Sequence, residues 1–287
     1  MLTPTQIEQY HDRGYVVARD VLSPADIARL RRVTDEFVEA SREATEHTDI
    51  FDLEPGHTPQ TPRLRRLKSP VASHAAYRDA LRHEGILAIV SSLIGEGLRY
   101  NGDKLNMKWS GYGSAVEWHQ DWAFYPHTND DLLAVGIALD DMTTENGCML
   151  MAPGSHKGPI YDHHQDGVFV GAITDDAFDP SGAVEVTMKA GSISLHHARI
   201  AHGSRPNTSA SPRRLLLFQY CALDAWPLLG AGNWDAFNAT IIRGEPTWTP
   251  RVTDVPVRIP LPSPERVGSI YEIQTQLRRP LLGDAVR

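Results

Sequence analysis

The sequence predicts a mainly β fold, an antiparallel sandwich or barrel with helices packed around it. Three observations lead to this prediction. From about residue 98, short apolar runs alternate with clusters of turn residues, which is typical of antiparallel sheets. Before that point the apolar residues follow helical spacing. No internal repeat, low-complexity tract or linker divides the 287 residues, so we expect one domain over 1–287.

Composition places the chain among ordinary soluble proteins. The net charge of −8 argues against a nucleic-acid or anionic-membrane partner. We see no signal pattern and no apolar run of membrane-spanning length. Cys148 and Cys221 lie in apolar runs, as reduced, buried thiols do. We therefore expect a cytoplasmic protein, with its oligomeric state left open.

The clearest predicted helix is SPADIARLRRVTDEFVEASREA, residues 23–44. Ser23 suits the N-cap and Pro24 the first helical position. Four apolar residues share one face of this helix, namely Ile27, Leu30, Val33 and Phe37.

The other elements follow in order along a helical N-terminal region (about 1–97), a β-core (about 98–225) and an irregular C-terminal region (about 226–287). In the N-terminal region we expect a helix over 3–14, a strand over 15–21, a long polar loop over 46–70 and a second helical zone over 77–95. The strands of the core are expected in six runs: 99–109, 132–142, 147–155, 183–191, 192–197 and 213–223.

The stretch WHQDW, residues 118–122, contains a candidate metal site. In a strand, His119 and Asp121 would project from the same face. Two histidines and one carboxylate with open positions suit a non-haem Fe(II) that also binds cosubstrate and O₂. The alternative is a hydrogen-bonded surface pair. The third ligand must come from elsewhere, and the downstream candidates are His127, His156, His163, His164, His196, His197 and His202.

The segment HGSRPNTSASPRRLLLFQY singles out His202 among these candidates. A turn follows this histidine, and then Arg213 or Arg214 opens a strongly apolar strand. An arginine near a metal is well suited to hold a carboxylate in bidentate geometry. A dicarboxylate that chelates iron at one end needs such an anchor at its other end.

The motifs HQD, NGCMLMAPGSHKG and HGSRPNTSASPR resemble the phytanoyl-CoA dioxygenase family of Fe(II)/2-oxoglutarate oxygenases, and LTPTQIEQYHDRGYVVARDVLSPADIARLR resembles the opening of that family. The resemblance covers most of residues 2–221. It implies a double-stranded β-helix core, a cupin-like jelly-roll with flanking helices. It also implies that His119, Asp121 and His202 are the iron ligands.

The resemblance also implies a set of cosubstrate contacts. Arg213, eleven residues after His202, matches the arginine that grips the distal carboxylate of 2-oxoglutarate, and Ser204 matches a position that assists it. In DKLNMKW the polar residues alternate with apolar ones, so Asn106 shares a face with Lys104. Asn106 matches a residue that reaches the cosubstrate, and Lys104 is expected to contact cosubstrate or substrate.

The implied reaction is hydroxylation of an unactivated C–H bond in a small metabolite, with 2-oxoglutarate and O₂ consumed and succinate and CO₂ released. Asp121 favours hydroxylation over halogenation, because related halogenases lack this carboxylate. A metal-dependent hydrolase or isomerase on a cupin barrel and a non-catalytic binding protein are the alternatives. The substrate is not readable from the sequence; loops 45–70, 156–180 and 222–250 are expected to select it.

Two further sets of residues have a functional and a structural interpretation. His163 and His164 either line a substrate entrance or lie in a polar loop. Lys104 and Lys108 are by default solvated charges.

Overall fold

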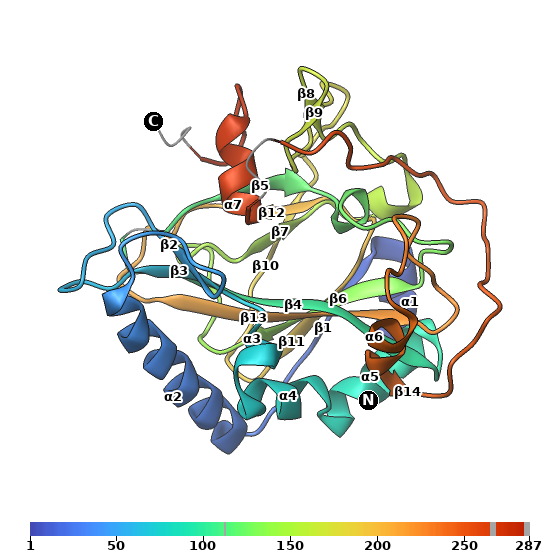
Figure 1. The fold of residues 1–287 in the computed structure, drawn as a ribbon, viewed down its shortest axis with the longest axis horizontal. Coiled ribbons are helices and arrows are strands. Elements are labelled where there is room, and N and C mark those ends of the chain that lie inside the picture. The colour runs from blue at the N-terminus through green and yellow to red at the C-terminus, as the bar shows by residue number, and fades with distance from the viewer. Residues whose placement is uncertain (112, 265–267, 284–287) are drawn as a thin grey trace.

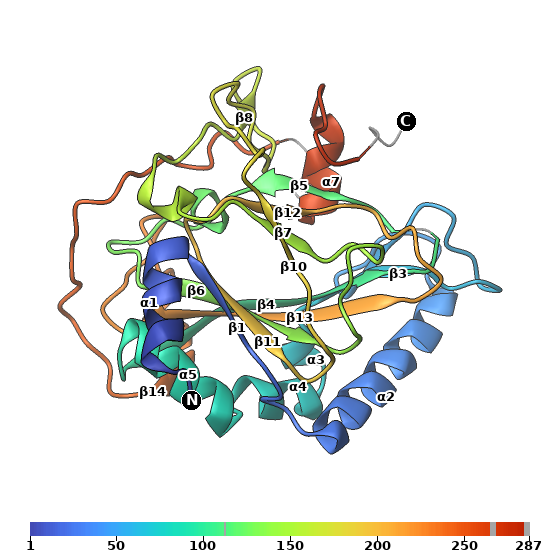
Figure 2. The same cartoon turned by 180° about the vertical axis from the view of Figure 1, so that it is seen from behind.

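The computed structural model describes residues 1–111, 113–264 and 268–283. Two antiparallel sheets face each other and enclose the interior of a jelly-roll, as predicted (Figures 1 and 2). The larger sheet has the order β1 (Tyr15–Ala18), β11 (Ile193–His197), β6 (Leu132–Ala138), β13 (Arg213–Ala222), β4 (Leu98–Lys108), β3 (Leu64–Lys68) and β2 (Phe51–Leu53), with β14 (Ile241–Arg243) paired to β4.

The smaller sheet supplies the opposite wall. Its order is β10 (Val184–Val186), β7 (Met149–Met151), β12 (His202–Ser204) and β5 (Val116–His119), and a separate two-stranded ribbon joins β8 (His164–Gln165) to β9 (Val168–Phe169). The residues expected to form the site therefore come from strands on both walls.

Helices cover the outer face of the larger sheet, below it in Figure 1. They are α2 (Pro24–Ala40), α3 (Pro70–Ser73), α4 (Ala75–Leu81) and α5 (Glu84–Ile94), and the remaining helices are α1 (Pro4–Arg13), α6 (Trp234–Ala239) and α7 (Ile270–Ile273). The predicted start of α2 is confirmed by a capping box. The Ser23 side chain accepts from the Asp26 N–H, and the Asp26 carboxylate accepts from the Ser23 N–H. No helix in the described part of the chain has the length and hydrophobicity needed to cross a bilayer.

Strand β13 separates two apolar layers by simple alternation. Leu216 and Phe218 pack with the helices on one face, whereas Leu215 and Leu217 point between the sheets. Cys148 and Cys221 are buried free thiols, as expected.

The prediction of a long loop over 46–70 is wrong, because this segment contains β2 and β3. The apolar side chains of Leu53, Leu64 and Leu67 are buried in the core, and β3 extends the larger sheet through β4. A buried ion pair of 2.6 Å between Arg65 and Asp52 ties the hairpin together. The polar, proline-containing composition concealed two short strands, of which β2 forms the edge of the sheet.

The helical zone expected over 77–95 is divided in two. Helix α4 ends at Leu81 and α5 begins at Glu84, with His83 between them. The expected C-terminal region is largely irregular apart from α6, β14, α7 and a short 3₁₀ helix, and it includes residues 265–267 and 284–287, which lie outside the described part.

Candidate metal and cosubstrate site

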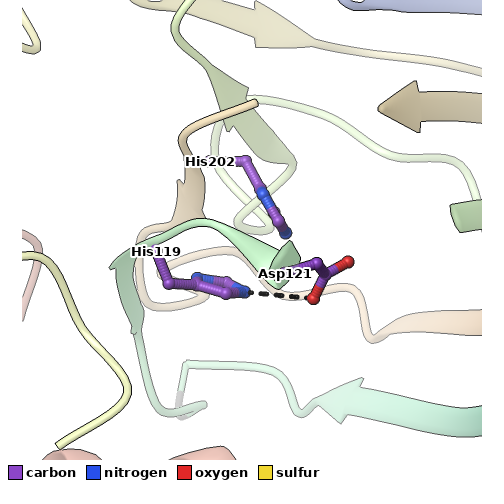
Figure 3. A group of neighbouring side chains, drawn as sticks. All are labelled: His119, Asp121 and His202. Atoms are coloured by element: carbon purple, nitrogen blue, oxygen red, sulfur yellow. Dashed lines mark ion pairs between the residues drawn. The ribbon is translucent and has the colours of Figure 1, made fainter. Parts of the chain in front are cut away.

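Three predicted metal ligands meet between the two sheets (Figure 3). His119 ends β5 and lies opposite His202, the first residue of β12. One ligand atom each from His119, Asp121 and His202 lie within 4.8 Å of one another, and all three residues are buried. His119 Nε2 is 3.9 Å from Asp121 Oδ1, and the two imidazole centroids are 4.1 Å apart. This is a compact set of two nitrogens and one carboxylate.

The expected strand does not continue through Asp121. It ends at His119, and Asp121 begins a short 3₁₀ helix over Asp121–Ala123. Period-two alternation is therefore the wrong reason for the shared direction of His119 and Asp121. The turn after the strand brings the carboxylate back to the same cavity.

Backbone carbonyls set the orientation of both histidine rings. His119 Nδ1 lies 2.8 Å from the Glu117 carbonyl, and His202 Nδ1 lies 3.1 Å from the Ile200 carbonyl. Each Nδ1 donates to its carbonyl, which leaves Nε2 as the free electron-pair donor. Burial lowers the pKa of His119 to about 4 and the pKa of His202 well below its usual value. Both rings are therefore neutral at pH 7, as metal ligands must be.

The carboxylate is held in its ionised form. Burial alone would raise the pKa of Asp121, but Lys104 and His196 outweigh it and hold that pKa well below its usual range. Lys104 Nζ lies 3.8 Å from Asp121 Oδ1, and His196 Nε2 lies 3.5 Å from Asp121 Oδ2. The site therefore presents one negative ligand and two neutral ones.

Gln120, between the two ligands, is clamped by its surroundings. Its backbone N–H donates to His163 Nε2 at 3.0 Å, and His163 Nδ1 donates to the Tyr161 carbonyl at 2.9 Å. The Gln120 side chain donates to the Arg199 carbonyl at 2.8 Å and accepts from the Tyr161 N–H at 2.9 Å. His163 thus supports the turn that carries the ligands, a role that the sequence did not reveal.

Burial of His163 should make the fold sensitive to acid. Burial lowers its pKa to about 3, whereas an unfolded histidine titrates near about 6.5. As the pH falls below the unfolded value, the unfolded state binds a proton that the folded state does not. The free energy of unfolding therefore falls toward pH 3, by about 1.4 kcal/mol per pH unit for this residue.

Urea unfolding at several pH values tests this expectation. Between about pH 7.5 and about pH 5, His163→Gln should lose about 2 kcal/mol less unfolding free energy than the wild type. His11→Gln, at an exposed position, is the control and should retain the wild-type slope. If the unfolding free energy fell with pH equally in His163→Gln and the wild type, the lowered pKa of His163 would be contradicted.

The structure distinguishes between the two candidate arginines. Arg213 is 2% exposed and faces the site, where its Nε and Nη2 donate to the Gly147 carbonyl at 3.1 and 2.7 Å. Arg214 points the other way and forms ion pairs with Asp140 and Asp35, at 2.8 and 2.6 Å. Among the described residues no carboxylate forms an ion pair with Arg213, so its charge is available to a ligand.

Lys108 is not a solvated charge, contrary to expectation. It is fully buried beside Arg213, and its ammonium donates to the carbonyls of Ser204 and Arg205. Burial lowers its pKa well below the usual value. It fixes the end of β12, the strand that begins with His202.

All seven predicted site residues line one small cavity of about 40 Å³. A further sign of a ligand is Asn106, whose Oδ1 is buried without a hydrogen-bond partner. The predicted members are Lys104, Asn106, His119, Asp121, His202, Ser204 and Arg213, and the structure adds Val116, Met149, His196, Gly203, Leu215, Leu217 and Ile270. A larger groove of about 1050 Å³ shares none of these residues, although α7 and β5 contribute to both.

The rival histidines other than His196 lie outside this cavity. Their rings contact other groups: His127 the Tyr125 carbonyl, His156 the His11 carbonyl, His163 the Gln120 N–H, His164 the Asp162 carboxylate, and His197 the Asp130 carboxylate.

Comparison with known proteins agrees with this geometry. The family model of phytanoyl-CoA dioxygenase (PhyH) matches residues 10–215. The probable alpha-ketoglutarate-dependent hypophosphite dioxygenase of Stutzerimonas stutzeri is 37% identical over 278 residues, which cover 95% of this chain and 97% of that protein. The methylphosphonate hydroxylase of Gimesia maris is 28% identical over 222 residues, 77% of this chain and 82% of its own length.

Solved structures show the same architecture. EvdO2 from Micromonospora carbonacea var. aurantiaca, complexed with 2-oxoglutarate, superposes with a TM-score of 0.63 at 25% identity, over 77% of this chain and 91% of that one. EctD from S. alaskensis with bound Fe superposes with a TM-score of 0.67 at 22% identity, over 89% of this chain and 88% of that one, and shows the fold.

The fold and the matches define a non-haem iron, 2-oxoglutarate-dependent dioxygenase with a jelly-roll core. The chain belongs to the phytanoyl-CoA dioxygenase family. It uses Fe(II), 2-oxoglutarate and O₂ to hydroxylate a small molecule, with release of succinate and CO₂.

Proposed function

We propose that His119, Asp121 and His202 hold the catalytic Fe(II). The convergence of their three ligand atoms within 4.8 Å in a buried cavity is the observation that supports this assignment. The donor set fits the metal, because two neutral imidazoles and one carboxylate on one side leave the remaining positions open. Gln120 and its partners keep the first two ligands in place, and the carbonyls of Glu117 and Ile200 orient the two imidazoles.

Arg213 is the anchor for the distal carboxylate of 2-oxoglutarate in this proposal. Its buried guanidinium has no anionic partner among the described residues, and it faces the cavity that contains the three ligands. Ser204 and Asn106 also line this cavity, where the Ser204 hydroxyl and the Asn106 Nδ2 can donate to oxygens of the cosubstrate. When bound, Fe(II) and 2-oxoglutarate supply the oxidation, in which one atom of O₂ enters succinate and the other enters the product.

The substrate that these observations favour is a small phosphorus oxyanion. The relatives named above as a hypophosphite dioxygenase and a methylphosphonate hydroxylase support this class. Two cationic side chains, Lys104 and Arg213, line the cavity, which favours an anionic ligand. Oxidation of hypophosphite converts one P–H bond into P–OH and gives phosphite, with 2-oxoglutarate as the co-reductant.

We also propose that residues 1–287 act as one domain without a nucleic-acid or membrane partner. All three predicted regions contribute strands to the larger sheet, through β1 to β3, the core strands and β14. The net charge of −8 opposes binding to polyanions.

An anaerobic titration followed by turnover tests the function. Fe(II) and then 2-oxoglutarate, added to metal-free protein, should produce the weak visible charge-transfer band of chelated 2-oxoglutarate. Admission of O₂ with hypophosphite should then release one succinate per phosphite. A well-folded protein that gives no band would refute the iron site. A band without substrate-stimulated succinate, from either hypophosphite or methylphosphonate, would refute the substrate class alone.

A further inference from the structure

A polar cluster lies on the side of Asp121 remote from Arg213. Strand register places Lys104 and Arg213 at opposite ends of the cavity. On β4, Arg213 lies opposite Lys108, and Lys104 lies four residues further along, opposite Leu217. Four residues along a strand correspond to about 13 Å. A cosubstrate that extends from Arg213 to the three metal ligands therefore reaches Asp121 from one end of the cavity, and Lys104 approaches the same carboxylate from the other end.

Lys104 brings a buried charge to this end. Its side chain is 16% exposed, and within the described residues its only ion pair is the 3.8 Å contact with Asp121. Its neighbours facing into the jelly-roll include the apolar Leu217. An ammonium in such surroundings needs an anionic partner. Asp121 can serve only in part, because its charge is shared with a bound metal ion.

His196 supplies the second observation. It is 1% exposed, lines the cavity, and neither ring nitrogen forms a hydrogen bond in the described part of the chain. Its ring centroid is 4.5 Å from that of His202, and its Nε2 is 3.5 Å from Asp121 Oδ2. Among the described residues its Nδ1 has no hydrogen-bond partner and its Nε2 makes only the long contact with Asp121, so the ring can still bind a ligand. Its place beside the metal ligands points to the substrate.

The balance of charge agrees with an anionic substrate. Fe(II) brings two positive charges, and Lys104 and Arg213 bring one each. Asp121 and the two carboxylates of 2-oxoglutarate bring three negative charges together. Positive charge therefore exceeds negative charge around the cavity, even before Lys108 beside Arg213 is counted, and an anionic substrate compensates for the excess.

We propose that Lys104 and His196 form an oxyanion subsite that holds the substrate next to the iron, at the end of the cavity opposite Arg213. Lys104 binds one substrate oxygen through its ammonium, and His196 donates to an oxygen from its ring. The ligand that this pair of donors suits is a compact oxyanion such as a phosphinate, a short phosphonate or a short carboxylate. This inference rests on the proposed function, because it places the substrate relative to the proposed iron ligands.

The test separates binding of cosubstrate from binding of substrate in Lys104→Met. The anaerobic charge-transfer band measures 2-oxoglutarate affinity, and the change in this band on adding hypophosphite measures substrate binding without turnover. We expect the 2-oxoglutarate midpoint to stay within about threefold of wild type, while the hypophosphite midpoint rises about 10- to 100-fold. Lys104→Arg, which keeps the charge, should recover part of the loss.

His196→Phe keeps a ring in the same space and removes both nitrogens. It should weaken hypophosphite binding in the same assay and leave the 2-oxoglutarate midpoint near the wild-type value. Lys68→Met is the matched control, because Lys68 pairs with Lys104 across β3 and β4 but donates to the Thr48 carbonyl at an exposed position. Parallel titrations with methylphosphonate and L-proline distinguish a phosphorus oxyanion from a carboxylate.

Each contrary outcome has a separate meaning. A large loss of 2-oxoglutarate affinity in Lys104→Met would make Lys104 a cosubstrate contact and overturn the subsite. Unchanged midpoints in both variants would overturn it as well. A wild-type band that none of the three probes perturbs would refute the subsite and leave the iron site standing. Absence of the band in wild type would refute the proposed iron site, and the subsite with it.

Discussion

Replacement of Asp121 by alanine is expected to abolish hydroxylation in a protein that still folds. Asp121 is the only carboxylate among the three converging ligand atoms, and its charge is what compensates a divalent ion in a buried site. Loss of a residue that only supports a ligand costs about 10- to 100-fold in metal affinity or activity, so loss of the ligand itself should exceed about 100-fold. Succinate release and anaerobic Fe(II) binding measure the effect.

Asp162→Ala serves as the control for Asp121→Ala. Asp162 lies on the surface side of the ligand-bearing turn, where it pairs with His164 and Arg258 at 2.9 and 3.0 Å. Its loss should leave iron binding unchanged. Thermal unfolding of metal-free Asp121→Ala should show a cooperative transition at a lower temperature than wild type, because Lys104 loses its only ion pair among the described residues. Full product formation by this variant would remove Asp121 from the ligand set.

The linear motifs were sufficient to predict most of the site. His119 and Asp121 are two residues apart, and Arg213 follows His202 by eleven residues. Residues this near in sequence stay near in space even when the secondary structure is predicted wrongly. Asp121 lies after the strand and not in it, yet it still reaches the cavity that His119 lines. The alternation of DKLNMKW correctly placed Lys104 and Asn106 on one face, because the strand is long and regular.

The remaining features depend on contacts between distant segments. His196 and His197 are adjacent in sequence, and only the pairing of β11 with β6 and β1 decides which ring enters the cavity. Ile270 lines the same cavity from α7, which lies close to β5 and β12 in both views of the fold. Burial of Lys108 results from the turn after His202 folding over its ammonium. No local pattern encodes these positions.

Arg213→Ala should separate the cosubstrate anchor from the iron site. Removal of a charge-assisted, bidentate contact to a carboxylate costs about 1.5–3 kcal/mol, which raises the 2-oxoglutarate midpoint of the charge-transfer band about 10- to 100-fold. Fe(II) binding without cosubstrate should stay near wild type, because the Gly147 carbonyl is the only hydrogen-bond partner of the Arg213 side chain among the described residues. Arg213→Lys should recover part of the affinity, because it keeps the charge and loses the forked geometry.

Arg214→Ala is the matched control for this experiment, since the two arginines are adjacent on β13 and point to opposite faces. Arg214 is bound by Asp140 and Asp35 on the side of the helices, so its loss should lower stability and leave the 2-oxoglutarate midpoint unchanged. If Arg214→Ala weakened 2-oxoglutarate binding and Arg213→Ala did not, the anchor would lie on the face of β13 that packs toward the helices, and the assignment to Arg213 would be contradicted. Such a result would require β13 to be shifted by one residue, because such a shift exchanges the two faces of a strand.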